Sequence, residues 1–264
     1  YDVYVGTKID DDGTIYSLYD SWTNHRDERK GRFCIKFNAV NAKGKLLSHF
    51  RISKFDTDIV GHFYDPGPVG KYGRNERYRL EDFEIDGDYV DYIIVRSDFG
   101  GYDYADFMKG TVKYSLQRVN WKTGEIVSFH ELPRPCQKLC GGFPYGTDMN
   151  SFYKYSKDGR ECLWENMLPE GKASLGKRSR DMLKQKYCVT EGKLFYANVN
   201  GVYMLSTLEN NSAPQRLITA RECPALKDGL SIVVQILAVN EKCFYMTVSG
   251  ENGRPDYLFR YRKR

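Results

Sequence analysis

The sequence predicts an all-β protein built from repeated antiparallel hairpin units. The chain of 264 residues contains 21 Tyr and 14 Phe, which suit the half-buried surface of a pleated sheet. Its 24 Gly can supply many tight turns. A third observation is internal repetition at hairpin positions, described next. Together the three observations favour many short strands over helices.

The clearest repeat is a hairpin. Residues Val40–Ser48 read like residues Val119–Ser128: each enters a turn rich in Lys and Gly as one strand and leaves it as another. Glycine supplies the positive φ that such turns require. The second copy carries one extra turn residue.

A second recurring element precedes these hairpins. It consists of an acidic or Asn residue, a turn and an aromatic-rich strand, and its copies are residues 12–19, 86–93, 191–198 and 240–247. After each copy comes a variable loop and then a strand of the type Tyr-x-Leu, at residues 112–116, 201–205 and 256–260, with residues 33–37 as the equivalent in the first unit. The order of these elements gives four strands per unit.

Four strands in about 40 to 50 residues is the period of a β-propeller blade. The last two units begin about 50 residues apart, at Gly192 and Glu241. The pattern resembles the repeats of bacterial and extracellular β-propellers in which a Tyr-rich strand follows Asp-Gly. No Trp-Asp repeat, Tyr-Trp-Thr-Asp tetrapeptide or double-Gly kelch signature is present, so the resemblance names no single family. It implies a β-propeller of about five four-stranded antiparallel blades.

The repeats predict one domain over residues 1–264. Its repeat units are expected near residues 8–52, 82–132, 187–220 and 233–264, with insertions near 53–81 and 166–186. A degenerate blade is expected around Phe152–Leu163, and a short helix over Lys177–Lys186. We expect the strand Tyr1–Val5 to supply the outer strand of the last blade, because the last unit ends soon after its Tyr-x-Leu strand.

The composition disfavours some classes of binding partner but does not decide between cellular compartments. The 40 Lys and Arg exceed the 35 Asp and Glu only slightly, so a nucleic-acid partner is not expected. The sequence contains no run of about 18 apolar residues, so it predicts no membrane-spanning helix. The seven Cys include no C-x-x-C pair, and we expect most of them to be reduced thiols in the core. Reduced thiols favour a reducing compartment. The resemblance to repeat propellers favours an extracellular location instead. The sequence predicts no oligomeric state.

Motifs for metals, cofactors and catalysis are missing from the sequence. The run Asp10–Gly13 lacks the acidic residue that a calcium loop needs at Lys8, so a turn is the better interpretation. The spacings of His130, Cys136, Cys140 and Cys162 match no zinc template, and a Cys136–Cys140 disulfide remains an alternative. There is no Gly-x-Ser-x-Gly motif and no phosphate-binding loop, and we therefore expect no catalytic residue, metal or cofactor.

Two long loops carry the functional prediction. They cover residues 21–30 and 97–108 and join the second and third strands of the first two units, so they should emerge on the same face. They contain aromatic residues beside both acidic and basic residues, a composition typical of interaction surfaces. We predict a binding or scaffold module for a protein or glycan partner, with partner-binding residues Trp22, Tyr102, Tyr104 and Phe107.

Two alternatives stay open at this point. A carbohydrate-active hydrolase could use paired carboxylates in the central pocket of a propeller, although no pair is singled out. An acidic partner could instead bind electrostatically to the basic segment 172–186, which includes Lys177, Arg178, Arg180 and Lys184.

Overall fold

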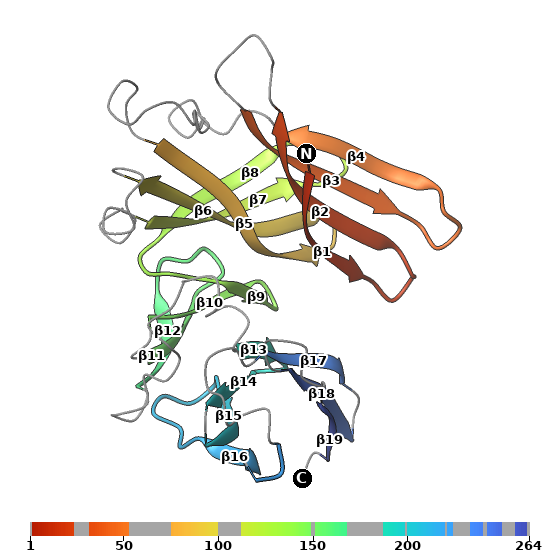
Figure 1. Cartoon of the computed structure of the whole chain (residues 1–264). Coiled ribbons are helices and arrows are strands. Elements are labelled where there is room, and N and C mark those ends of the chain that lie inside the picture. The colour runs from red at the N-terminus through yellow and green to blue at the C-terminus, as the bar shows by residue number, and fades with distance from the viewer. Residues whose placement is uncertain are drawn as a thin grey trace. The chain divides into compact units, whose positions relative to one another are not determined.

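The computed structural model describes residues 2–23, 32–52, 75–99, 112–148, 151–167, 187–198, 200–219, 221–223, 233–239, 242–249 and 257–262. Within these ranges every regular element is a β-strand, and Figure 1 numbers the strands along the chain. The same ranges contain no apolar helix of membrane-spanning length.

The strands form five antiparallel sheets, and in each sheet the strand order follows the chain. We call these sheets blades. Blade 1 contains β1 (Asp2–Ile9), β2 (Ile15–Thr23), β3 (Arg32–Val40) and β4 (Leu46–Ile52). Blade 2 contains β5 (Asn75–Asp86), β6 (Tyr89–Phe99), β7 (Val112–Asn120) and β8 (Ile126–Leu132).

The remaining blades follow the same plan. Blade 3 contains β9 (Lys138–Cys140), β10 (Phe143–Thr147), β11 (Ser151–Tyr155) and β12 (Cys162–Met167). Blade 4 contains β13 (Tyr187–Thr190), β14 (Lys193–Asn198), β15 (Gly201–Ser206) and β16 (Gln215–Thr219). Blade 5 contains β17 (Val233–Val239), β18 (Cys243–Ser249) and β19 (Tyr257–Arg262).

A four-stranded antiparallel meander repeated along the chain is the building block of a β-propeller. The predicted all-β, β-propeller fold class is therefore confirmed, and the five sheets agree with the expected blade number. Blade 3 occupies the place where a degenerate blade was expected, with β11 and β12 spanning Phe152–Leu163.

The expected role of the first strand is wrong. β1 pairs with β2 in blade 1, from Asp2 opposite Ser21 to Ile9 opposite Ile15. The tight turn between them makes this local pairing available at little entropic cost, because closing a short loop orders few residues. The helix expected over Lys177–Lys186 lies outside the described residues.

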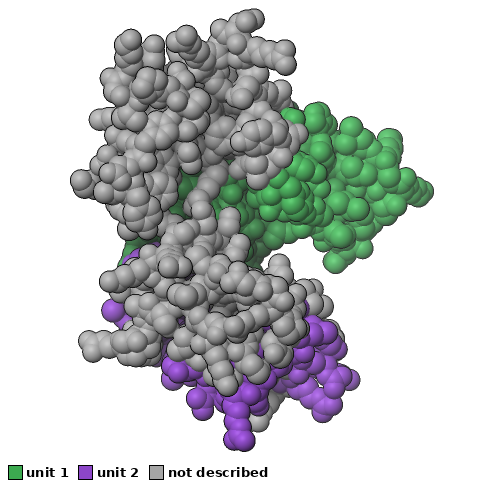
Figure 2. Space-filling model, viewed as in Figure 1, with its two compact units in different colours: residues 1–142, 158–160 green, residues 143–157, 161–264 purple. Residues whose placement is uncertain are grey.

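By their internal contacts the residues divide into two compact units, coloured separately in Figure 2. Unit 1 contains residues 1–142 and 158–160, and unit 2 contains residues 143–157 and 161–264. The organisation of residues 1–264 as one domain stays a prediction. Each unit has its own hydrophobic core.

The two repeated hairpins share one turn chemistry. In blade 1 the Asn41 carboxamide oxygen accepts the backbone N–H groups of Lys43, at 3.0 Å, and Lys45, at 2.9 Å. In blade 2 the Asn120 carboxamide oxygen accepts those of Lys122 and Thr123, at 3.0 and 3.2 Å. The turns end in Gly44 and Gly124, whose φ angles are 78° and 77°. The predicted hairpin repeat is confirmed, extra turn residue included.

The core of unit 1 lies between blades 1 and 2. Rings dominate it: Phe37 stacks on Phe50 with centroids 4.8 Å apart, and Trp121 meets the Tyr16 ring edge-on at 5.5 Å. Ser48 of blade 1 also donates a hydrogen bond of 2.6 Å to the Trp121 carbonyl of blade 2. The buried members of this core are Tyr16, Leu18, Ile35, Phe37, Ala39, Leu80, Phe83, Val90, Tyr92, Ile94, Val119 and Trp121.

The core of unit 2 joins blades 4 and 5. Its buried members are Phe195, Ala197, Val202, Ile218, Cys223, Met246 and Val248. Within unit 2, side-chain hydrogen bonds join β12 of blade 3 to the β15–β16 connection of blade 4. The Trp164 indole donates to the Glu209 carbonyl at 2.8 Å, and the Asn166 amide donates to the Ser212 carbonyl at 2.7 Å.

Candidate functional site

The predicted site residues lie mostly outside the described part of the chain. Tyr102, Tyr104 and Phe107 fall within residues 100–111, and Lys177, Arg178, Arg180 and Lys184 fall within residues 168–186. The prediction that Trp22 lies in a loop is wrong: it belongs to β2, which continues to Thr23, and its backbone lies opposite Phe33 of β3. These residues therefore stay predictions.

The strands that flank the two predicted loops are equivalent. Residues 24–31 connect β2 to β3, and residues 100–111 connect β6 to β7. Both connections join the second and third strands of a blade, as expected from the sequence. The described residue that follows the second connection is Val112, at the start of β7.

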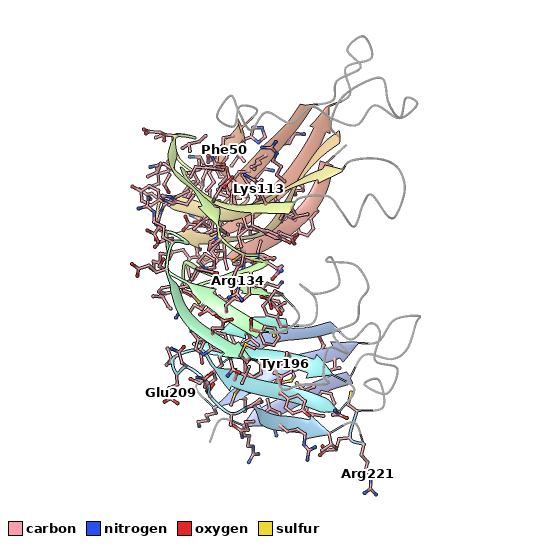
Figure 3. The ribbon with its side chains drawn as sticks, turned by 90° about the vertical axis from the view of Figure 1, so that its left-hand side faces the viewer. Phe50, Lys113, Arg134, Tyr196, Glu209 and Arg221 are labelled. Atoms are coloured by element: carbon pink, nitrogen blue, oxygen red, sulfur yellow. The ribbon has the colours of Figure 1, made fainter. Side chains whose placement is uncertain are left out.

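A hollow of about 530 Å³ begins at this point of unit 1. It is open to solvent and takes its lining from three stretches of chain: the start of β7, the end of β8 with the residues after it, and the turn between β11 and β12. The lining residues are Val112, Lys113, Tyr114, Glu131, Leu132, Pro133, Arg134, Pro135, Gly159 and Arg160. Figure 3 labels Lys113 and Arg134.

Charged side chains dominate the rim of this hollow. The Lys113 ammonium lies 3.0 Å from the Glu131 carboxylate across the β7–β8 pair. The Arg160 guanidinium lies 3.5 Å from Asp158 and 3.4 Å from His130 Nδ1. Tyr114 and Leu132, only 3% and 7% exposed, form the apolar floor beneath them. The arrangement can bind a polar or charged group of a ligand above an apolar base.

The turn that carries Arg160 is tightly packed. Gly159 has a φ of 76°, and a Cβ atom there would collide with the Leu132 side chain. Glycine suits this position, because an L-residue is strained at this φ and its Cβ would displace the Leu132 side chain. The turn that carries Arg160 therefore packs closely against the end of β8.

Two carboxylates on β5, Asp82 and Glu84, bear on the alternative of a hydrolase with paired acids. Glu84 accepts the backbone N–H of Gly142 at 2.7 Å, and Asp82 accepts that of Leu139 at 2.9 Å. Burial raises the pKa of Glu84, and hydrogen bonds from the Gly142 and Gly141 N–H groups oppose that shift. Both carboxylates thus tie β5 to the β9 region and do not line the hollow. Sequence reasoning missed them, since nothing local marks β5 acids as backbone acceptors.

The acidic run that was weighed as a calcium loop has a structural role. The Asp10 carboxylate accepts the N–H groups of Asp12 and Thr14 at 3.1 and 2.8 Å and the Tyr16 hydroxyl at 2.8 Å, which confirms a turn leading into β2. The Tyr16 hydrogen bond, together with the two N–H groups, lowers the pKa of Asp10. In the described ranges no three His, Cys, Asp or Glu side chains are grouped to hold a metal ion.

Comparisons with known proteins identify no family for this chain. No family model matches the chain, and no curated protein matches it. Among solved structures, one similar chain is the AfRom2 CNH domain, with 6% sequence identity, a TM-score of 0.29 and coverage of 97% of this chain and 94% of that chain. A TM-score of that size does not establish a shared fold, so the fold assignment depends on the sheets themselves.

Proposed function

We propose that this chain is a non-catalytic binding or scaffold module that holds a protein partner at the loop end of blades 1 and 2. The observation that carries the proposal is the hollow at the start of β7, which begins directly after residues 100–111. The predicted contact residues Tyr102, Tyr104 and Phe107 belong to that connection, and Trp22 precedes the equivalent connection of blade 1.

The repeat architecture supports this proposal on physical grounds. A blade is a rigid sheet, and the connections between its strands tolerate changes that the core does not. Binding residues on such connections are positioned by the sheet without taking part in its packing. Aromatic side chains give large contact areas at a low cost in side-chain entropy, which makes them frequent hot spots of protein interfaces.

The other candidate functions have less support. Asp82 and Glu84 are occupied by backbone N–H groups, so they do not favour a hydrolase. The basic segment 172–186 lies outside the described residues and stays a prediction. No observation on the described part of the chain favours a glycan over a protein partner.

The test is affinity capture with a matched pair of variants. The double variant Tyr102→Ala/Tyr104→Ala is compared with the unchanged chain and with Lys43→Glu, which alters an exposed turn of blade 1. We expect a specific partner to be lost from the double variant alone, with circular dichroism and the melting temperature unchanged. Retention of every partner by the double variant would reject the proposal.

A further inference from the structure

We infer that the hollow beside β7 binds a carboxylate group from an acidic segment of the partner protein. This inference rests on the proposed function and adds the chemistry of the ligand. Three cations line the hollow, Lys113, Arg134 and Arg160. Two acids oppose them, Glu131 in the lining and Asp158 beside Arg160, so the described charges leave a positive excess. A hollow with this balance attracts anions and disfavours cations.

The three cations come from separate parts of the chain. Lys113 is on β7, Arg134 follows β8, and Arg160 is on the turn between β11 and β12. Their meeting is therefore a product of the fold and has no counterpart in a local basic run of the sequence. Because three separate segments supply cations to one hollow, a carboxylate bound there can contact more than one of them.

A ligand carboxylate can replace the acidic partner in the ion pairs at the hollow. Lys113 and Glu131 keep 52% and 61% of their side-chain surface exposed, and Arg160 and Asp158 keep 68% and 46%. Ion pairs as exposed as these contribute little to stability, so a ligand carboxylate can replace Glu131 at Lys113 without a large loss. Arginine adds a planar fork that fits a carboxylate with two parallel hydrogen bonds.

The backbone around the hollow is restricted. Pro133 and Pro135 flank Arg134 and have fixed φ angles, and Gly159 is held against Leu132. Less backbone entropy is lost on binding when the site is already ordered. The prolines and Val112 also offer apolar surface, so a peptide with alternating acidic and aliphatic residues fits better than a free anion.

The experiment measures binding of a short synthetic peptide of alternating Glu and Leu to the full chain by isothermal calorimetry. The variants are Lys113→Glu, Arg160→Glu and the charge exchange Lys113→Glu/Glu131→Lys, with Lys43→Glu as the control. We expect each single reversal to weaken the peptide roughly five- to tenfold, as for exposed pairs, and high salt to weaken it as well. The charge exchange keeps the number of cations in the hollow and should restore binding.

Three results separate the possibilities. Equal binding of a peptide with Gln in place of Glu would overturn the inference, because it would show that the carboxylate is not recognised. Binding of inorganic phosphate in place of the peptide, with the same variant dependence, would overturn it in favour of a phosphate site. Loss of partner capture in Tyr102→Ala/Tyr104→Ala together with an absence of peptide binding would overturn the inference alone and leave the proposed function standing.

Discussion

Equivalent rows of aliphatic residues cross blades 1 and 2, but three of the four residues are exposed in blade 1, whereas the two central residues are fully buried in blade 2. In blade 1 the row runs across paired positions of β1 to β4 and consists of Ile9, Ile15, Val40 and Leu46. In blade 2 the equivalent row runs across β5 to β8 and consists of Ile85, Val90, Val119 and Ile126. The hairpin repeat aligns the two rows, and both hairpins shift register at the same place.

Their surroundings differ sharply. Ile9, Ile15 and Leu46 are 67%, 40% and 55% exposed, whereas Val90 and Val119 are fully buried against blade 1. Strand pairing and turn chemistry place the aliphatic row at the same position in each blade. Its contribution to stability depends on what covers it, since complete burial of such a side chain stabilises by about 1.5 to 3 kcal/mol. Equal sequence patterns therefore do not imply equal energetic weight.

The largest difference should follow from a charge placed in each row. Val90→Asp buries an unpaired carboxylate in the core of unit 1 and should destabilise it by more than about 4 kcal/mol. Ile15→Asp occupies the equivalent position, paired with Val40, and should cost less than about 1 kcal/mol because water reaches it. Urea unfolding followed by Trp fluorescence measures both. Similar costs would show that something covers the blade 1 row.

The position after the turn Asn gives the next largest contrast. Trp121 is 7% exposed, packs on Tyr16 and donates its indole N–H to the Gly87 carbonyl at 2.8 Å. Trp121→Ala should cost about 3 to 5 kcal/mol through the cavity it leaves. The equivalent residue of blade 1 is the exposed Ala42, where Ala42→Ser should change stability by less than about 0.5 kcal/mol. Thermal unfolding of the two variants would show whether the positions differ as the packing implies.

The turn residues themselves should behave alike. Asn41→Ala and Asn120→Ala each remove a side-chain acceptor of two backbone N–H groups. Each should cost about 1 kcal/mol, because the turns are exposed and water replaces part of the lost bonding. A denaturant midpoint measured for each variant tests this equality. A cost several-fold larger at Asn120 would mean that its turn also transmits strain to Trp121.

Two carboxylates should give small effects of opposite sign with pH. The pKa of Asp10 is lowered by its hydrogen bonds, so its contribution is present above pH 3.8, its ordinary pKa, and is lost as the pH falls below it. The pKa of Glu84 is raised by burial, so the folded state holds its proton longer and stability declines as the pH rises above 4.5, its ordinary value.

Neutral variants of the two carboxylates isolate the contribution of each one to the pH dependence of stability. Asp10→Asn should flatten the acid side of the stability profile, and Glu84→Gln should flatten the decline above pH 4.5 while still accepting the Gly142 N–H. Melting temperatures recorded across the pH range measure both. A steeper decline in Glu84→Gln would contradict burial as the cause of its pKa.

Local sequence features predicted the local structure well. The Asn and Gly of each turn, the aromatic strands and the Tyr-x-Leu strands all appear where expected, because turn geometry and side-chain alternation are set by neighbouring residues. The pairing of β1 was predicted wrongly, because the Asp10–Gly13 turn was not recognised as the turn of a hairpin that joins β1 to β2. Lys113, Arg134 and Arg160 form one rim only because three distant segments meet, and no spacing in the sequence reveals that meeting.

The pairing of β1 with β2 has a consequence for synthesis of the chain. Every strand pair in blade 1 joins neighbours in sequence, so the whole sheet is complete once β4 has left the ribosome. Such short-range pairing favours rapid folding, and a chain emerging at about 5 to 20 residues per second allows ample time for it. The rings of Tyr16 and Phe37 lack their contact with blade 2 until Trp121 has emerged after β7, so a chaperone that shields them would act in that interval.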